Sequence, residues 1–190
     1  MRIKYNSPAV LTFTLLCAII LLLTENFFPN LIKNWFMVPG KGEFHITKII
    51  TIFTHVMGHG SWTHLFGNFM FILIIGPMLE ENYGSPAILV MIVITAFITG
   101  ILNILFFAGP LLGASGVVFM MILLSSFTNF SKGEIPLTFI LVLLLYMGIQ
   151  FIESFKADNI SQFAHIIGGL CGSFFGFVRM PVMRYNHQRR

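Results

Sequence analysis

The chain has 190 residues, of which 56% are hydrophobic and only 9% are charged, and its mean hydropathy is +0.88. Soluble domains of this size carry roughly a quarter charged residues, so the composition excludes an ordinary soluble domain. The formal net charge of +4 does not indicate nucleic-acid binding, because the basic residues gather near the chain ends and form no folded basic domain. We therefore expect an all-α polytopic membrane protein that forms one domain over residues 1–190.

Six segments reach roughly the length of a membrane crossing. No charged residue occurs between Glu81 and Lys132, a stretch about twice as long as one crossing needs. The first segment lacks a small-residue cleavage site, so we interpret it as a retained helix and not as a signal peptide. With a helical core over about residues 8–178, the predicted spans are Pro8–Phe28, Trp62–Leu79, Ser85–Phe107, Gly113–Phe130, Ile135–Ile152 and Ile160–Val178.

The longest connection, about residues 29–61, contains more than a tether. Apolar residues recur there at helical spacing between polar ones, which predicts an amphipathic helix lying in the membrane interface. They are Ile46, Ile49, Ile50, Phe53, Val56 and Met57. A second, shorter connection over residues 108–112 is apolar but contains Gly109 and Pro110, which break a helix. We expect this link to dip into the membrane where protein satisfies its backbone.

An even number of spans places both chain termini on one side of the membrane. Seven of the eleven basic residues, six near the chain ends together with Lys132, fall on that side. The opposite side carries four, namely Lys33, Lys41, Lys48 and Lys156. The positive-inside bias therefore predicts that both termini are cytoplasmic.

The fourth predicted span begins with Gly113-Ala114-Ser115-Gly116. A hydroxyl at the start of a helix lies beside unpaired backbone N–H groups and the positive end of the helix dipole. Such donors can stabilise a tetrahedral oxyanion, so Ser115 is a candidate nucleophile. The alternative is that these small residues only allow close packing between helices.

His165 lies near the start of the last predicted span, and Gly168, Gly172 and Gly176 follow it at four-residue spacing. This pattern lets another helix approach closely. If that helix is Gly113–Phe130, His165 can take the Ser115 proton and later return it to the leaving amine. The alternative is a structural histidine bonded to a backbone carbonyl.

His64 and Asn68 are four residues apart and therefore share one helical face. Both can donate side-chain hydrogen bonds, so they are candidate donors of an oxyanion site. His55 and His59 repeat this spacing upstream, and we interpret them as residues that order the first loop. A metal or haem site on His55, His59 and His64 is the alternative, because histidines at this spacing can share a metal.

Acidic residues are missing from the interiors of the predicted spans, since all seven lie at predicted helix ends or in loops. A Ser-His-Asp triad is therefore not expected. The sequence favours a Ser115–His165 dyad in which something other than a carboxylate orients the histidine. No cofactor is expected.

Three motifs, taken in order, resemble the rhomboid family of intramembrane serine proteases. They lie in or just before the second, fourth and sixth predicted spans, and the similarity extends over about residues 53–177. The motifs are His55-x3-His59 leading to His64-Leu65-Phe66-Gly67-Asn68, then Gly113-Ala114-Ser115-Gly116, then Ala164-His165-Ile166-Ile167-Gly168-Gly169.

This resemblance implies a six-helix bundle around a water-filled cavity that opens away from the cytoplasm. It implies that Ser115 is the nucleophile and His165 the general base. His64, Asn68 and the Ser115 backbone amide would form the oxyanion site, and Glu153–Ile160 would cap the cavity. The implied partners are the lipid bilayer and transmembrane protein substrates, whose helices must unwind because a helix hides its peptide bonds. We expect a multi-pass protein of a bacterial plasma membrane.

Two positions depart from the family pattern. Many members have a tyrosine four residues after the nucleophile, where this chain has Phe119, which can keep ring stacking on His165 but has no hydroxyl. The Trp-Arg pair of the family's first loop is replaced by Trp35-Phe36. Besides an active protease, a rhomboid-like protein that binds transmembrane helices without cleaving them stays open as an alternative.

Overall fold

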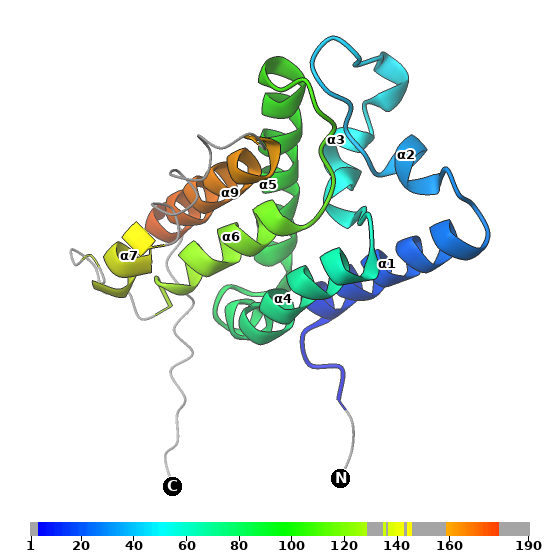
Figure 1. Ribbon diagram of the computed structural model, residues 1–190. Helices are drawn as coiled ribbons and strands as arrows, with labels where there is room; N and C mark the ends of the chain where they lie inside the picture. Colours follow the sequence, from blue (N-terminus) through cyan, green and yellow to red (C-terminus); the bar gives the residue numbers. More distant parts are fainter. Residues whose placement is uncertain (1–3, 129–134, 136, 143, 146–158, 179–190) are drawn as a thin grey trace, which may run out of the picture.

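The structure is a computed structural model that describes residues 4–128, 135, 137–142, 144–145 and 159–178. Within these residues the fold is all-helical, and the only β-type pairing is an isolated bridge between Val38 and Leu111. The elements shown in Figure 1 are α1 Pro8–Asn26, α2 Leu31–Trp35, η1 Ile46–Lys48, α3 Thr51–Thr54, η2 His55–Met57, α4 Trp62–Tyr83, α5 Ser85–Phe106, α6 Ser115–Ser125, α7 Leu137–Val142 and α9 Asn159–Val178.

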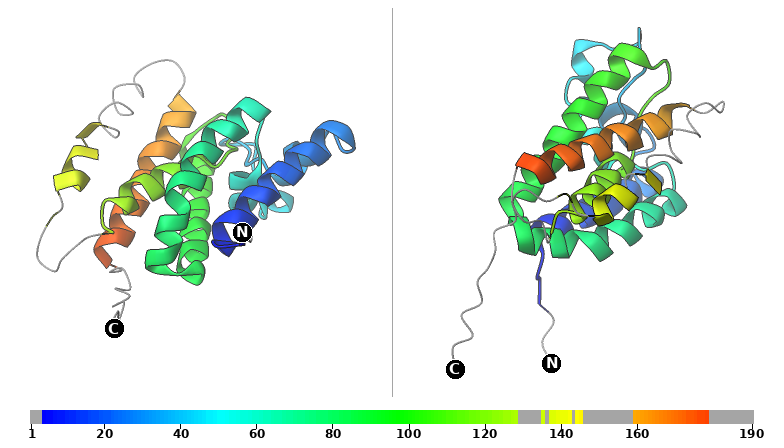
Figure 2. Two further views of the ribbon diagram at one scale, coloured as in Figure 1. Left: turned by 90° about the horizontal axis from the view of Figure 1, so that it is seen from below. Right: turned by 90° about the vertical axis from the view of Figure 1, so that its left-hand side faces the viewer.

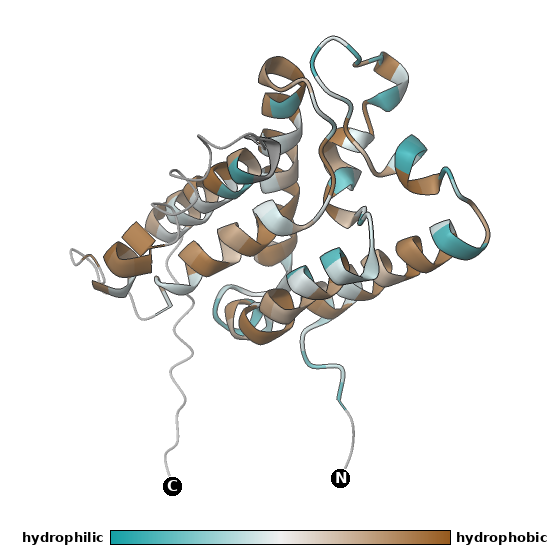
Figure 3. Ribbon diagram, in the orientation of Figure 1, coloured by the Kyte–Doolittle hydropathy of each residue, from teal (hydrophilic) through white to brown (hydrophobic). Residues whose placement is uncertain are grey.

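Three of the described helices, α1, α4 and α5, are long and apolar enough to cross a membrane. They correspond to the first three predicted spans, and their apolar residues dominate the hydropathy colouring of Figure 3. The fourth predicted span corresponds to α6, which is shorter than expected at 11 residues. The sixth corresponds to α9, with 20 residues. Of the fifth, only α7 and its immediate neighbours fall within the described residues.

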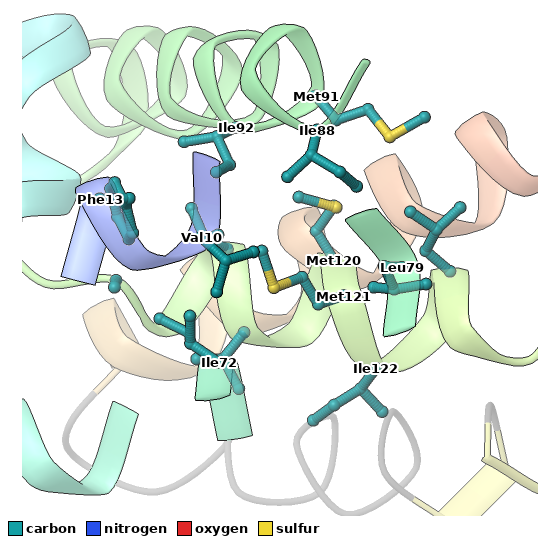
Figure 4. Packing of buried hydrophobic residues seen from close by; sticks show 14 of the residues in the cluster. Val10, Phe13, Ile72, Leu79, Ile88, Met91, Ile92, Met120, Met121 and Ile122 are labelled. Atoms are coloured by element: carbon teal, nitrogen blue, oxygen red, sulfur yellow. The ribbon is translucent and has the colours of Figure 1, made fainter. Parts of the chain in front are cut away.

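The helix α6 forms the centre of the bundle. Every residue from Gly116 to Leu124 is buried, as expected for a helix that is apolar on all sides. It contacts α4, α5, α7 and α9, and the views of Figure 2 show it between α4 and α9. Its Met120 and Met121 belong to the same hydrophobic core as Val10 and Ile72 (Figure 4). A short central helix thus packs against the longer helices α4, α5 and α9.

The helix α4 continues beyond its predicted end at Leu79, because Glu80 has a structural role inside the fold. Glu80 is 5% exposed, and its carboxylate accepts hydrogen bonds of 2.9 Å from the backbone N–H groups of both Ala9 and Val10. The Ser85 hydroxyl donates a third, at 2.6 Å. A carboxylate at the N-terminus of α1 satisfies unpaired amides and complements the helix dipole. It joins α1 to the turn between α4 and α5.

The predicted amphipathic helix of the first loop consists of three short pieces, η1, α3 and η2. Its apolar side chains divide between two environments: Ile46 and Ile49 are exposed, whereas Ile52 and Val56 are buried. The Thr51 hydroxyl donates to the Lys48 carbonyl at 2.6 Å. Such local side-chain bonds offer the backbone an alternative to a regular helix. The segment therefore follows the surface of α5 and does not continue as one straight cylinder.

Candidate active site

The helices α6 and α9 approach each other along a line of glycines. A Cβ atom at Gly168 would overlap the carbonyl oxygen of Gly116, and one at Gly172 would overlap the carbonyl oxygen of Met120. One turn further, Gly176 faces the Phe127 ring. This confirms that the helix beginning with Ser115 is the partner of the small-residue face of α9. No larger residue fits at these positions without separating the two helices.

Ser115 is the first residue of α6 and is half-buried. The loop before it turns at Gly113, whose φ of +112° is a conformation that side chains disfavour. The Gly113 N–H donates to the His55 carbonyl at 3.0 Å. A Cβ at Gly113 would lie only 2.7 Å from two ring atoms of His64. The serine is therefore held at a helix start, and the His64 imidazole lies beside Gly113, two residues before it.

His165 is half-buried on the first turns of α9 and stacks on Phe119. The two ring centroids are 4.3 Å apart and the rings are 9° from parallel. Phe119 lies one turn after Ser115 on α6, so the stacked imidazole lies beside the first turn of that helix. His165 is also close enough to His64 to interact with it electrostatically. The expected stacking is confirmed, and an aromatic ring orients this histidine.

Asn68 and His59 form a hydrogen-bonded pair near the start of α4. Asn68 is buried, and its Nδ2 lies 3.0 Å from Nε2 of His59. The other His59 nitrogen, Nδ1, faces the Met57 carbonyl at 3.3 Å. Since only a protonated nitrogen can donate to a carbonyl, Nδ1 carries the hydrogen and Nε2 accepts from the Asn68 amide. This bond fixes the orientation of the Asn68 side chain.

His59 therefore supports the candidate site by orienting Asn68. The sequence-based prediction, in which His59 only orders the first loop, missed this role. Its ring also packs edge-on against His64, with 5.0 Å between centroids. The only sequence signal was the repeated four-residue spacing of histidines. The eight residues between His59 and Asn68 include a turn into α4, where Ser61 accepts a bond from the His64 N–H at 3.2 Å. Periodicity cannot indicate a contact across such a turn.

His55, by contrast, orders the loop as predicted. It is buried, and its Nδ1 lies 3.2 and 3.1 Å from the carbonyls of Thr51 and Ile52. Its Nε2 lies 3.3 Å from the Thr99 hydroxyl on α5. Because its own carbonyl accepts from Gly113, this residue joins the first loop, α5 and the loop that carries Ser115.

We expect the protein to lose stability on acidification below about pH 6.5. Burial lowers the pKa of His55 and of His59 to about 4, and the neighbouring His64 adds to this effect at His59. Between pH 6.5 and 4 the unfolded chain binds more protons, so stability is full above 6.5 and is lost as the pH falls toward 4. Thermal unfolding in detergent, followed across this range, measures the loss.

The matched variants for this measurement are His55→Gln and His45→Gln. His55→Gln removes one titrating group, so its unfolding temperature should depend less steeply on pH. His45 is exposed in the same loop, and its replacement should leave the pH profile unchanged. Equal profiles for wild type and His55→Gln would contradict the assignment.

The sequence also suggested a cap over the cavity and, as an alternative, a metal site on the histidines. The predicted cap, Glu153–Ile160, lies outside the described residues apart from Asn159 and Ile160, which begin α9. Among the described residues, no group of three or more His, Cys, Asp or Glu side chains is placed to hold a metal ion.

Comparison with known proteins places the chain in a family. The model of the Rhomboid domain matches residues 47–182. The chain is 27% identical over 172 residues to Rhomboid protease GlpG of Haemophilus influenzae, and the alignment covers 88% of each protein. It is 29% identical over 157 residues to RHOMBOID-like protein 1 of Arabidopsis thaliana, covering 76% of this chain and 39% of the plant protein. It is also 29% identical over 128 residues to RHOMBOID-like protein 4 of Arabidopsis thaliana, covering 63% of this chain and 31% of that protein.

The matched region contains all the residues that the structure brings together around Ser115. Together with the all-helical fold and its apolar helices, it shows that the chain belongs to the rhomboid family of integral membrane proteins.

Proposed function

We propose that this protein is an intramembrane serine endopeptidase that cleaves transmembrane segments with a Ser115–His165 dyad. The observation that carries the proposal is the glycine contact between α6 and α9, together with the stacking of His165 on Phe119. This arrangement supports the proposal, because an imidazole lies beside the first turn of the helix that Ser115 begins. A structural serine used only for packing would not require a histidine oriented in this way.

In the proposed reaction, His165 takes the proton of the Ser115 hydroxyl as its oxygen attacks the scissile carbonyl. The carbonyl oxygen becomes an oxyanion that the Ser115 amide, His64 and Asn68 stabilise. His165 then passes the proton to the leaving amine, which yields an acyl-enzyme and a free amino end. Water, activated by the same histidine, hydrolyses the acyl-enzyme. The positive end of α6 favours the negative charge at both steps.

The surrounding architecture belongs to the same proposal. We infer six membrane spans in a single domain over residues 1–190, with both termini in the cytoplasm of a bacterium and the site reached from the other side. The partners are the bilayer and transmembrane proteins whose helices unwind locally, since a regular helix shields its peptide bonds. No cofactor and no nucleic acid takes part.

The direct test is cleavage of a labelled transmembrane substrate by the full chain reconstituted in lipid vesicles. We expect a product cut within the membrane-embedded segment, and the same rate when a metal chelator is added. Strong inhibition by the chelator would favour a metal site on the histidines. A protein that binds the transmembrane helix and never cleaves it would be the inactive rhomboid-like alternative.

We expect Asn68→Ala to lower kcat with little effect on KM. Removing one oxyanion donor costs about 10²–10³ in kcat at most sites, and the loss should be smaller here because His64 and the Ser115 amide remain. Steady-state kinetics on a transmembrane substrate separate the two constants. Asn82→Ala is the matched control, because Asn82 lies at the far end of α4 and bonds only to the Met78 carbonyl among the described contacts. An unchanged kcat with a greatly raised KM would contradict this role.

A further inference from the structure

A polar cavity of about 580 Å³ lies where α1 begins, α4 ends and α5 begins. Lys4, Asn6 and Ser85 line it, together with the carboxylates of Glu80 and Glu81. From His64 to Glu80 the helix α4 rises by about 24 Å, so this cavity lies at the opposite end of α4 from Ser115. It has no part in the proposed cleavage reaction.

An apolar groove of about 200 Å³ runs between α1 and α5. On each helix its residues continue the face that lines the polar cavity. On α1, Pro8 lines the cavity, and Thr12 and Leu16 line the groove at successive four-residue steps. On α5, Ser85 is followed by Leu89 and Val93 in the same way. Residues four apart share one helical face, so the cavity and the groove follow the same faces of α1 and α5, and we call the two together the track.

The length of this track matches one leaflet of a bilayer. Phe53, Val56 and Met57 of the first loop line the groove together with Ala96, its lining residue on α5 that lies furthest from Ser85. From Ser85 to Ala96 the helix α5 rises by about 16 Å, and half of the hydrocarbon core is about 15 Å. An occupant with a polar head at Ser85 and an extended apolar chain would reach Ala96 at the far end of the groove.

The charged side chains that line the cavity favour one kind of head group over others. Glu80 already accepts bonds from two α1 amides and from Ser85, which leaves exposed Lys4 and Glu81 as the pair that faces a ligand. Two carboxylates and one ammonium disfavour a head group that carries only negative charge. A zwitterion complements them, with its phosphate at Lys4 and its cation at Glu81.

The residues that line the cavity favour a primary ammonium over a quaternary one as the cation of the head group. Quaternary ammonium groups are recognised by aromatic rings, and none of the described residues that line the cavity is aromatic. A primary ammonium instead donates charge-assisted hydrogen bonds to a carboxylate. We propose that this track binds one phosphatidylethanolamine-type lipid, with its head group in the cavity and one acyl chain in the groove between α1 and α5.

Native mass spectrometry of the delipidated full chain tests this proposal. Phosphatidylethanolamine, phosphatidylcholine and phosphatidylglycerol with identical acyl chains are each titrated in detergent. We expect one ethanolamine lipid to be retained per chain, with an apparent Kd about fivefold below that of either other lipid, the size expected of one ion pair near a surface. Equal retention of the three lipids, or preference for the glycerol lipid, would overturn the proposal.

Two variants with matched controls locate the bound lipid. Glu81→Gln should weaken ethanolamine-lipid binding about fivefold, whereas Glu43→Gln, in the exposed first loop, should not. Val93→Trp fills the groove and should weaken binding about tenfold, because it displaces several methylenes of the acyl chain. Its control is Leu22→Trp, since both side chains are about half exposed on long apolar helices. Variants that bind like their controls would show that the lipid does not occupy this track.

The readout does not depend on catalysis, so Ser115→Ala should bind the lipid as wild type does. A protein that cleaves its substrate but shows no lipid preference would refute the lipid site alone. A protein that binds the lipid but cleaves nothing would refute the proposed protease function alone.

Discussion

Replacing Ser115 with alanine is expected to abolish cleavage of a transmembrane substrate while the fold stays intact. The substitution removes only the hydroxyl, and alanine is at least as favourable as serine in a helix. Without that oxygen no acyl-enzyme can form. Initial rates in lipid vesicles measure the loss, and thermal unfolding shows whether the fold is kept.

Ser125→Ala is the control, since Ser125 lies at the other end of α6 and its hydroxyl donates to the Ile122 carbonyl at 2.7 Å. This variant should cleave at nearly the wild-type rate. Turnover that persists in Ser115→Ala would remove Ser115 from the mechanism.

The His165→Ala variant should be nearly as inactive, and the double variant hardly worse than either single one. Residues that act as one catalytic unit give losses that do not multiply. If the two losses multiplied, Ser115 and His165 would be acting independently and the dyad would be wrong. Phe119→Leu offers an intermediate case, because it removes the stacked ring that orients His165 and leaves both reacting groups in place.

Replacing Gly168 with alanine is expected to cause the largest loss of stability of any single added methyl group in the seam between α6 and α9. The new Cβ would overlap the Gly116 carbonyl oxygen, which is backbone and cannot rotate away. Overpacking of a core typically costs about 1–3 kcal/mol, and here the two helices must separate. Thermal unfolding in detergent measures the effect, and we expect cleavage to fall with it because Gly168 lies one turn after His165.

Gly67→Ala is the matched control for this prediction. Gly67 also lies within a long helix, α4, but a Cβ there would meet nothing within 4 Å. Alanine is favoured over glycine in a helix interior by about 1 kcal/mol, so this variant should be as stable as wild type or more so. Equal unfolding temperatures for the two variants would mean that the glycine seam does not hold α6 and α9 together.

The amino-acid sequence by itself determined the class of the protein and the ends of α1 and α5. Continuous apolar runs bounded by Gly, Pro and polar residues predicted α1 and α5 within one or two residues. The four-residue spacing of small residues on α9 predicted a closely packed partner. These signals are local, because hydropathy and helical periodicity depend on residues that are close together in the chain.

Only the tertiary structure decided the features that depend on distant residues. Glu80, whose charge marked the end of a span, is buried because it binds the amides of Ala9 and Val10, which lie 71 and 70 residues earlier in the chain. The regular helix predicted in the first loop is broken where it follows α5. His59 is hydrogen-bonded to Asn68 across a turn, and Phe119 of α6 stacks on His165 of α9. In each case the stabilising contact is made with a residue that helical periodicity does not place nearby, so no local pattern can specify it.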